Sequence, residues 1–176
     1  MYQIRDASPA DLSLIHKMQN LPVREKIMNR PLPPLEDFVT NTAQKMRDGC
    51  EKYYLLEQHG EAEGFIWISL AAETCEIWGK QLHSLFYACA RIAFENLSLN
   101  RLVWSVRQNN RRMLKICERF GIRSIGSDQI CVIENKFEFI AIGKIHYFEF
   151  KAEEYPERIS VMRKFSVQQG EFFQTV

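Results

Sequence analysis

The fold is decided by residues 85–122, LFYACARIAFENLSLNRLVWSVRQNNRRMLKICERFGI, which predict a helix, a strand and a second helix. Apolar residues recur at helical spacing over 85–97, and the run 101–106 is rich in residues that favour strands. Over 110–120, apolar residues at positions i, i+3, i+4 and i+7 form one buried helical face. Gly121 follows at once, where the end of a helix favours a residue that tolerates a positive φ.

The segments around this unit predict a sheet with helices packed on it. Residues 62–72 are apolar on both faces, which is typical of a strand inside a sheet, and 74–78 predict an antiparallel neighbour. Further strands are predicted at 2–5, 53–57, 129–134, 138–142 and 144–150, and further helices after Ser8 and over 35–46. Short helices joined to hairpin-rich β segments favour the α+β class. We therefore expect a three-layer α+β domain, with a mixed, mostly antiparallel sheet flanked by helices and one parallel strand pair.

Length and charge restrict the function classes. A chain of 176 residues predicts one domain, which we place at 1–155, with 156–176 as a helix and tail extension. Lys and Arg total 23 and Asp and Glu total 22, so the net charge of +1 argues against a nucleic-acid partner. The cluster Arg107, Arg111, Arg112 and Lys115 is more simply interpreted as a solvated helix face.

The apolar runs and the cysteines indicate a compartment. No apolar run reaches the length of a membrane span, and residues 1–6 do not have the pattern of a signal peptide, so we expect no membrane partner. The five cysteines are an odd number without a Cys-x-x-Cys pair, which argues against a disulfide framework and against a metal site. A reducing cytoplasm is the expected location.

One segment has a more specific pattern. Residues 106–122 resemble the second conserved block of the GNAT acyltransferases. In that block a Val ends a strand, an Asn follows four residues later, and a helix then ends in Glu-Lys-x-Gly-Phe. The matching positions are Val106, Asn110, Glu118, Arg119, Gly121 and Ile122. Residues 93–97 and 99–102 are also similar to the branch that acetylates the N-terminal amines of ribosomal proteins.

The resemblance implies the GNAT acyl-CoA N-acyltransferase fold and transfer of an acetyl group from acetyl-CoA to a primary amine. The acceptor would be a protein N-terminus or a small-molecule amine such as an amino sugar on a nucleotide carrier, and a homodimer is compatible with the pattern. The alternative is a binding or regulatory module that keeps the fold, has impaired acetyl-CoA binding and performs no catalysis.

In the family, two parallel strands splay apart to hold the pantetheine arm, and a glycine-rich loop at the start of a helix binds the pyrophosphate. The corresponding strands here are 76–78 and 102–106, and the loop is reduced to one glycine. The alternative for the loop segment is an ordinary strand-to-helix turn with a capping serine, and the alternative for Asn110 is a plain N-cap, unless Asn109 caps instead. The residues implied for acetyl-CoA binding are Ile77, Trp78, Gly79, Lys80, Gln81, Leu82, His83, Ser84 and Asn110.

The reaction also needs a base for the amine and an acid for the departing thiolate. Glu76 is implied as the base, because many family members have a carboxylate on this strand that faces the cleft, although an exposed strand glutamate is the commoner interpretation. Glu73 and His83 are weaker candidates. Cys117 occupies the position of the family's tyrosine acid, but it also shares a stripe with core residues. Tyr87 and Tyr147 are further candidates for the acid.

Overall fold

A computed structural model describes residues 2–20, 32–133, 140–167 and 173–175. The described strands form one eight-stranded sheet in the order β6-β7-β5-β4-β3-β2-β1-β8. The strands are β1 (Tyr2–Asp6), β2 (Glu51–Gln58), β3 (Glu61–Ser69), β4 (Thr74–Gly79), β5 (Arg101–Arg107), β6 (Ser124–Ile133), β7 (Ile140–Lys151) and β8 (Phe173–Thr175). The helices are η1 (Pro9–Asp11), α1 (Leu12–Gln19), α3 (Leu35–Arg47), α4 (Leu82–Arg91), the π-helical η2 (Ile92–Asn96), α5 (Arg111–Arg119), η3 (Ala152–Glu154) and α6 (Tyr155–Val167).

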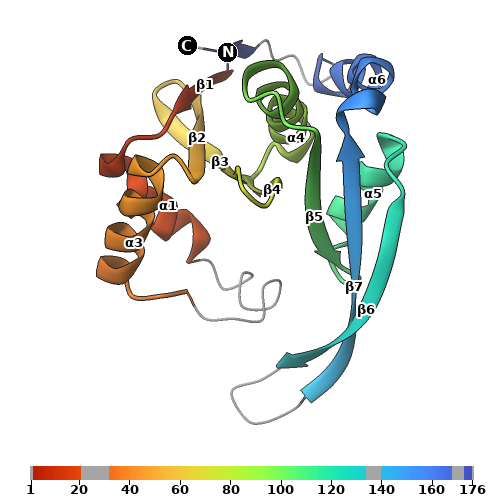
Figure 1. The fold of residues 1–176 in the computed structure, drawn as a ribbon, viewed down its shortest axis with the longest axis horizontal. Coiled ribbons are helices and arrows are strands. Elements are labelled where there is room, and N and C mark those ends of the chain that lie inside the picture. The colour runs from red at the N-terminus through yellow and green to blue at the C-terminus, as the bar shows by residue number, and fades with distance from the viewer. Residues whose placement is uncertain (1, 21–31, 134–139, 168–172, 176) are drawn as a thin grey trace.

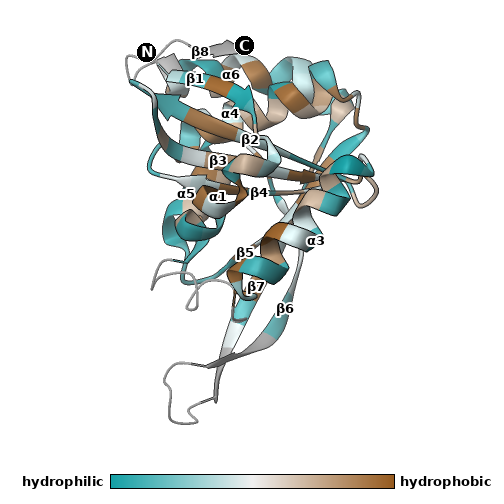
Figure 2. Cartoon of the chain, turned by 90° about the vertical axis from the view of Figure 1, so that its left-hand side faces the viewer, coloured by the Kyte–Doolittle hydropathy of each residue, from teal (hydrophilic) through white to brown (hydrophobic). Residues whose placement is uncertain are grey.

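The helices lie on the two faces of the sheet. Helices α1 and α3 cover one face, and α4, α5 and α6 lie on the other side (Figures 1 and 2). An apolar cluster fills each of the two interfaces. The smaller one, under α1 and α3, contains Leu12, Ile15, Phe38, Leu55 and Phe65. The larger one, under α4, α5 and α6, contains Leu85, Phe86, Ile116, Phe120, Phe150 and Met162. The predicted three-layer α+β class is confirmed.

The strand pairing is mostly antiparallel, as predicted. Strands β1 to β4 form an antiparallel run, and β5, β7 and β6 form another. The parallel pair β4–β5 joins the two runs. A second parallel pair, β1–β8, was not predicted. The predicted strands 138–142 and 144–150 correspond to one strand, β7, in which Gly143 pairs with Ile130, and residues 134, 138 and 139 lie outside the described residues.

The unit that decided the sequence interpretation is present, with changes at its ends. The predicted helix 85–97 begins earlier, at Leu82, and its last turn is the π-helix η2, in which the amide of Leu97 donates to the carbonyl of Ile92. The predicted helix 110–120 is α5, and Gly121 after it has a φ of +70°. This left-handed conformation is the reason for a glycine at that position.

The C-terminal helix packs on the sheet domain. The side chain of Met162 on α6 is fully buried, and the guanidinium of Arg158 donates to the carbonyl of Phe120 at 3.2 Å. The helix predicted within 156–176 is confirmed by α6, which begins at Tyr155. The division into a domain 1–155 and an extension 156–176 stays a prediction. In the described residues, no helix combines the length and the apolar character that a membrane crossing requires.

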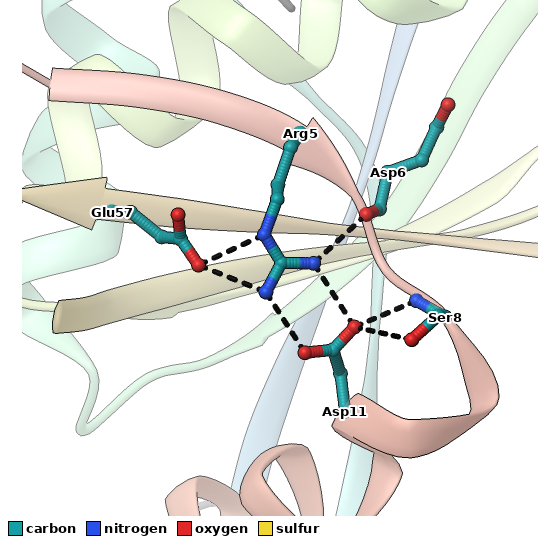
Figure 3. Close-up of polar contacts among 5 residues, drawn as sticks. All are labelled: Arg5, Asp6, Ser8, Asp11 and Glu57. Carbon is teal, nitrogen blue, oxygen red and sulfur yellow. Dashed lines mark hydrogen bonds and ion pairs between the residues drawn. The ribbon is translucent and has the colours of Figure 1, made fainter. Parts of the chain in front are cut away.

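A polar cluster fastens the first helical turn to the sheet (Figure 3). The Nη2 atom of Arg5 lies 2.8 Å from Oδ1 of Asp11, and its Nε donates to Glu57 on β2 at 2.9 Å. Asp11 also accepts from the amide of Ser8 at 2.7 Å. The Arg5 hydrogen bond holds the pKa of the Asp11 carboxyl well below its usual range. This cluster fixes the start of α1 on the sheet.

Candidate active site

Strands β4 and β5 are joined at one end and diverge from there. Thr74 and Val103 are the one pair in register between them within the described residues, and the amide of Val103 donates to the carbonyl of Glu73 at 2.8 Å. Strand β4 nevertheless pairs with β3 along its whole length, 74–79. The predicted splay between the two strands is therefore confirmed. It directs backbone groups of β4 and β5 toward a widening gap, where an extended ligand can meet them.

The closed end of the gap is held by charged side chains. Glu73, which has a positive φ of 50°, accepts from the amide of Asn100 at 3.1 Å and from Nε of Arg101 at 3.0 Å. Arg101 also donates to Glu149 on β7 at 3.1 Å. Glu73 therefore serves as part of an ion-pair clamp that ties β4, β5 and β7 together. This position accounts for Glu73 without a role as base.

The open end of the gap lies at the N-termini of two helices. Only Lys80 and Gln81 separate β4 from α4, and the carbonyl of Lys80 accepts a hydrogen bond from Arg112 in the first turn of α5. The ammonium of Lys80 lies 3.1 Å from Oε2 of Glu63. Since the N-terminal end of a helix carries partial positive charge, α4 and α5 together make this end of the gap suitable for an anionic group. Sequence reasoning missed Arg112, which it assigned to a solvated helix face.

Gly79 has a packing reason that is independent of any ligand. It pairs with Gly64 on β3, and its φ is +150°. A Cβ atom on Gly79 would lie 2.7 Å from the carbonyl oxygen of Glu63 and 2.8 Å from the Leu85 side chain. The two glycines let β3, β4 and the start of α4 approach closely. The single glycine of the predicted loop is thus explained by the fold.

Several other residues implied for acetyl-CoA binding pack against the two apolar clusters of the fold. The N-cap of α4 is Gln81, so the alternative in which Ser84 caps the helix is wrong. Ser84 is fully buried, and its hydroxyl has no hydrogen-bond partner in the described part of the chain. Leu82 is half-buried against the larger cluster. Trp78 stacks on Phe65, with ring centroids 6.4 Å apart, on the α1–α3 side. Ile77 packs against the larger cluster on the opposite face.

His83 lies against α5 and α6. Its ring is 5.9 Å from that of Phe120 and 6.3 Å from that of Phe165, and its Nε2 lies 3.3 Å from Nη1 of Arg119. Burial, together with the charges of Arg119 and Arg112, lowers the pKa of His83. The structure therefore places His83 among aromatic rings at the interface of three helices, away from Glu76.

This environment predicts acid sensitivity of the fold. The folded state favours neutral His83. Its contribution to the free energy of unfolding is therefore full above pH 6.5 and is lost as the pH falls through the lowered pKa of His83 in the folded protein. We expect the melting temperature of His83→Phe to fall less than that of the wild type between pH 7.5 and pH 5. The exposed His59→Asn is the control and should keep the slope of the wild type. Equal slopes in wild type and His83→Phe would contradict the assignment.

Asn110 caps α5. Its Oδ1 accepts a hydrogen bond from the amide of Met113 at 3.2 Å, so the alternative in which Asn109 caps the helix is wrong. This hydrogen bond satisfies one of the amides that a helix start leaves unpaired. Asn110 sits beside Arg111 and Arg112 at the open end of the gap. A contact with acetyl-CoA stays a prediction, and the remaining polar atoms of the side chain would have to make it.

Cys117 and the two tyrosines lie in different environments. Cys117 on α5 is 1% exposed, and burial raises the pKa of its thiol to about 12. Its role as an acid stays a prediction that this position does not favour. Tyr147 on β7 pairs with Ser105 on β5, and a hydrogen bond to Asp128 raises the pKa of its hydroxyl. Tyr87 lies on α4, with the guanidinium of Arg91 6.0 Å from its ring centre.

A pocket of about 330 Å³ opens on the α1–α3 side of the sheet. Its floor contains Tyr53, Trp67 and Glu76, which are direct neighbours across β2, β3 and β4. Its wall comes from α3 and the residues just before it, including Phe38. The charged residues of its lining are Asp37, Lys45, Glu51 and Glu76, and three carboxylates against one ammonium leave a net charge of −2.

Glu76 links this pocket to the gap. It lies on β4, which borders the gap, and its carboxylate faces the pocket, where Nε1 of Trp78 donates to it at 3.4 Å. Sequence reasoning found Glu76 but missed Glu51, because it began the strand at Tyr53. The alternation of a strand that starts at Glu51 would have placed Glu51 on the face of Tyr53.

A mixed sheet with one divergent parallel strand pair is the architecture of the GNAT N-acetyltransferases, and the chain has this fold. The particular structures it matches include spermidine N-acetyltransferase of Vibrio cholerae in complex with CoA and spermine, with a TM-score of 0.73 and 14% identity over 88% of this chain and 98% of that chain. A dodecameric structure of that enzyme in an intermediate state matches with a TM-score of 0.68 and 15% identity, over 89% and 97%. No family model and no curated protein matches the sequence.

Proposed function

We propose that the protein is an acetyl-CoA-dependent N-acetyltransferase that acts on a primary amine. The observation that carries this proposal is the position of Glu76, a carboxylate on the edge of the β4–β5 gap that also faces an acidic pocket. In this arrangement the gap holds the thioester donor and the pocket holds the amine. The matched enzyme of Vibrio cholerae, whose structure contains CoA and spermine, supports the assignment.

The proposed reaction uses few groups of the chain. Glu76 takes a proton from the bound ammonium, and the neutral amine nitrogen then attacks the thioester carbonyl to form a new C–N bond. Backbone amides that border the gap donate to the oxyanion that develops. The tetrahedral intermediate collapses, the C–S bond breaks with its electron pair on sulfur, and the thiolate takes a proton from water. The nitrogen gives its remaining extra proton to water, because Glu76 still holds the first proton, and Glu76 then releases that proton to solvent.

The pocket favours a cationic amine as acceptor over an amino sugar that carries phosphates. A net charge of −2 attracts an ammonium and repels the phosphates of an amino sugar on a nucleotide carrier. The likeness to enzymes that acetylate N-terminal amines of ribosomal proteins keeps a protein N-terminus as the second candidate, on the similarity of residues 93–97 and 99–102.

Donor binding tests the proposal directly. We expect saturable heat in calorimetry with acetyl-CoA, and weaker binding, by about 3- to 10-fold, in Lys80→Ala, because one charge near the phosphates is lost. Asn110→Ala should weaken binding as well, and Asn110→Asp, which keeps the N-cap, separates loss of the cap from loss of a ligand contact. No detectable heat at millimolar acetyl-CoA would overturn the proposal and favour the binding module without catalysis.

We also propose a cytoplasmic location, a homodimer and a domain that ends near residue 155. The absence of a predicted disulfide framework supports the location, and the dodecamer formed by the matched enzyme supports self-association. Size-exclusion chromatography with light scattering measures the oligomeric state.

A further inference from the structure

The candidate acceptor pocket contains a second carboxylate, Glu51, that the proposed chemistry does not use. Glu51 is 8% exposed and lies on β2, two residues before Tyr53. Its Oε1 lies 2.8 Å from Nζ of Lys45, and its Oε2 accepts from the Tyr53 hydroxyl at 3.3 Å. A buried carboxylate is costly unless it is paired and hydrogen-bonded, so the ammonium at Glu51 is a requirement of the site.

The ammonium at this site is easily exchanged. Lys45 lies in the last turn of α3, and its side chain is 57% exposed, whereas that of Glu51 is 10% exposed. Lys45 therefore reaches into the pocket from solvent on a flexible chain, and it can return to water with its charge solvated. A free alkylammonium has the same charge and hydrogen-bond donors as the end of a lysine side chain.

We propose that Glu51 is a second ammonium subsite, that Lys45 occupies it in the free protein, and that the acceptor is a linear diamine or polyamine. One amine of the acceptor lies at Glu76 and is acetylated, and the other displaces Lys45 from Glu51. The Glu76 end of this arrangement rests on the proposed function, while the Glu51 end rests on the pocket itself.

The sheet register gives the separation of the two carboxylates. Tyr53, Trp67 and Glu76 are neighbours across three strands, and Glu51 lies two residues along β2 from Tyr53. With neighbouring strands about 4.8 Å apart and a rise of about 3.4 Å per residue, the backbones of Glu51 and Glu76 are about 12 Å apart. This distance suits two ammonium groups joined by several methylenes.

The surface between the two carboxylates fits such a chain. Trp67 lies in the pocket floor between the strands of Glu51 and Glu76, and Phe38 on α3 lines the same pocket. Aromatic faces bury methylene groups and attract cations. Asp37, at the start of α3, adds a third carboxylate to the lining.

Calorimetry without acetyl-CoA tests the subsite. The probes are 1,5-diaminopentane, spermidine and the matched monoamine 1-aminopentane, titrated into wild type, Glu51→Gln and Lys45→Met. We expect the wild type to bind 1,5-diaminopentane and spermidine at least 10-fold more tightly than 1-aminopentane. Glu51→Gln should lose this preference and leave monoamine affinity unchanged. Lys45→Met should bind 1,5-diaminopentane and spermidine more tightly than the wild type does, by a factor of about 3 or more, because the competing ammonium of Lys45 is gone.

The outcomes separate the subsite from the proposed reaction. Equal affinity of wild type for diamine and monoamine, an unchanged preference in Glu51→Gln, or weaker diamine binding in Lys45→Met would each overturn the subsite. Thermal melts establish that each variant is folded, and Lys45→Met carries the test if Glu51→Gln does not fold. Because no acetyl-CoA is present, failure of donor binding leaves the diamine result intact, and failure of the diamine result leaves donor binding intact.

Discussion

Replacement of Glu76 by glutamine is expected to lower kcat by about 10²- to 10⁴-fold, the usual contribution of a general base. The glutamine amide keeps the size of the side chain but cannot accept the proton of the ammonium. Affinity for acetyl-CoA should be unchanged, because the carboxylate faces the pocket and not the open end of the gap. The measurements are the rate of thiol release and the calorimetric Kd for acetyl-CoA.

The matched control for this experiment is Glu61→Gln. Glu61 is also a glutamate of the sheet, but it is exposed at the start of β3 and does not line the pocket. Its replacement should leave kcat unchanged. If kcat of Glu76→Gln equals that of the wild type, Glu76 has no part in the proton transfer, and water or another group of the pocket must accept the proton.

Gly64→Ala is expected to destabilise the fold by about 3 kcal/mol, the upper part of the range for overpacked sites, and to lower the melting temperature by about 10 °C. A Cβ atom on Gly64 would lie 2.5 Å from the carbonyl oxygen of Trp78 and 2.8 Å from the Leu85 side chain. The first contact is with backbone, so β4 has to move. Since β4 borders the gap, affinity for acetyl-CoA should weaken as well. Thermal and denaturant melts measure the loss.

Gly126→Ala is the control for the glycine experiment. Gly126 lies on β6, and a Cβ atom there would meet nothing within 4 Å. Its replacement should change the free energy of unfolding by less than about 1 kcal/mol. A Gly64→Ala variant as stable as Gly126→Ala would show that β3 and β4 can separate without cost, and Gly79 would then need another explanation.

The parts of the fold predicted from sequence are those whose signals are local. The helical stripe that ends at Phe120, and Gly121 after it, define α5 within a single window of sequence. The parallel pairing of β8 with β1 joins residues more than 170 positions apart in number, and no local pattern encodes such a contact. The splay of β4 and β5 came from the family resemblance and not from periodicity.

The candidate site shows the same division. Glu76 was found because the resemblance assigned a role to its strand. Glu51, Lys45 and Trp67 come from three different elements, and only the register of the sheet and the packing of α3 bring them together. Cys117 shows the opposite case, since the family position suggested an acid while the apolar stripe on α5 correctly indicated a core residue.

The ion pairs of Arg101 with Glu73 and Glu149 lie where β4 and β5 meet, at the closed end of the gap. Because β4 and β5 pair only at this end among the described residues, the geometry there determines how far the two strands diverge. A substitution at Arg101, Glu73 or Glu149 would therefore alter the width of the gap without replacing any residue of its open end.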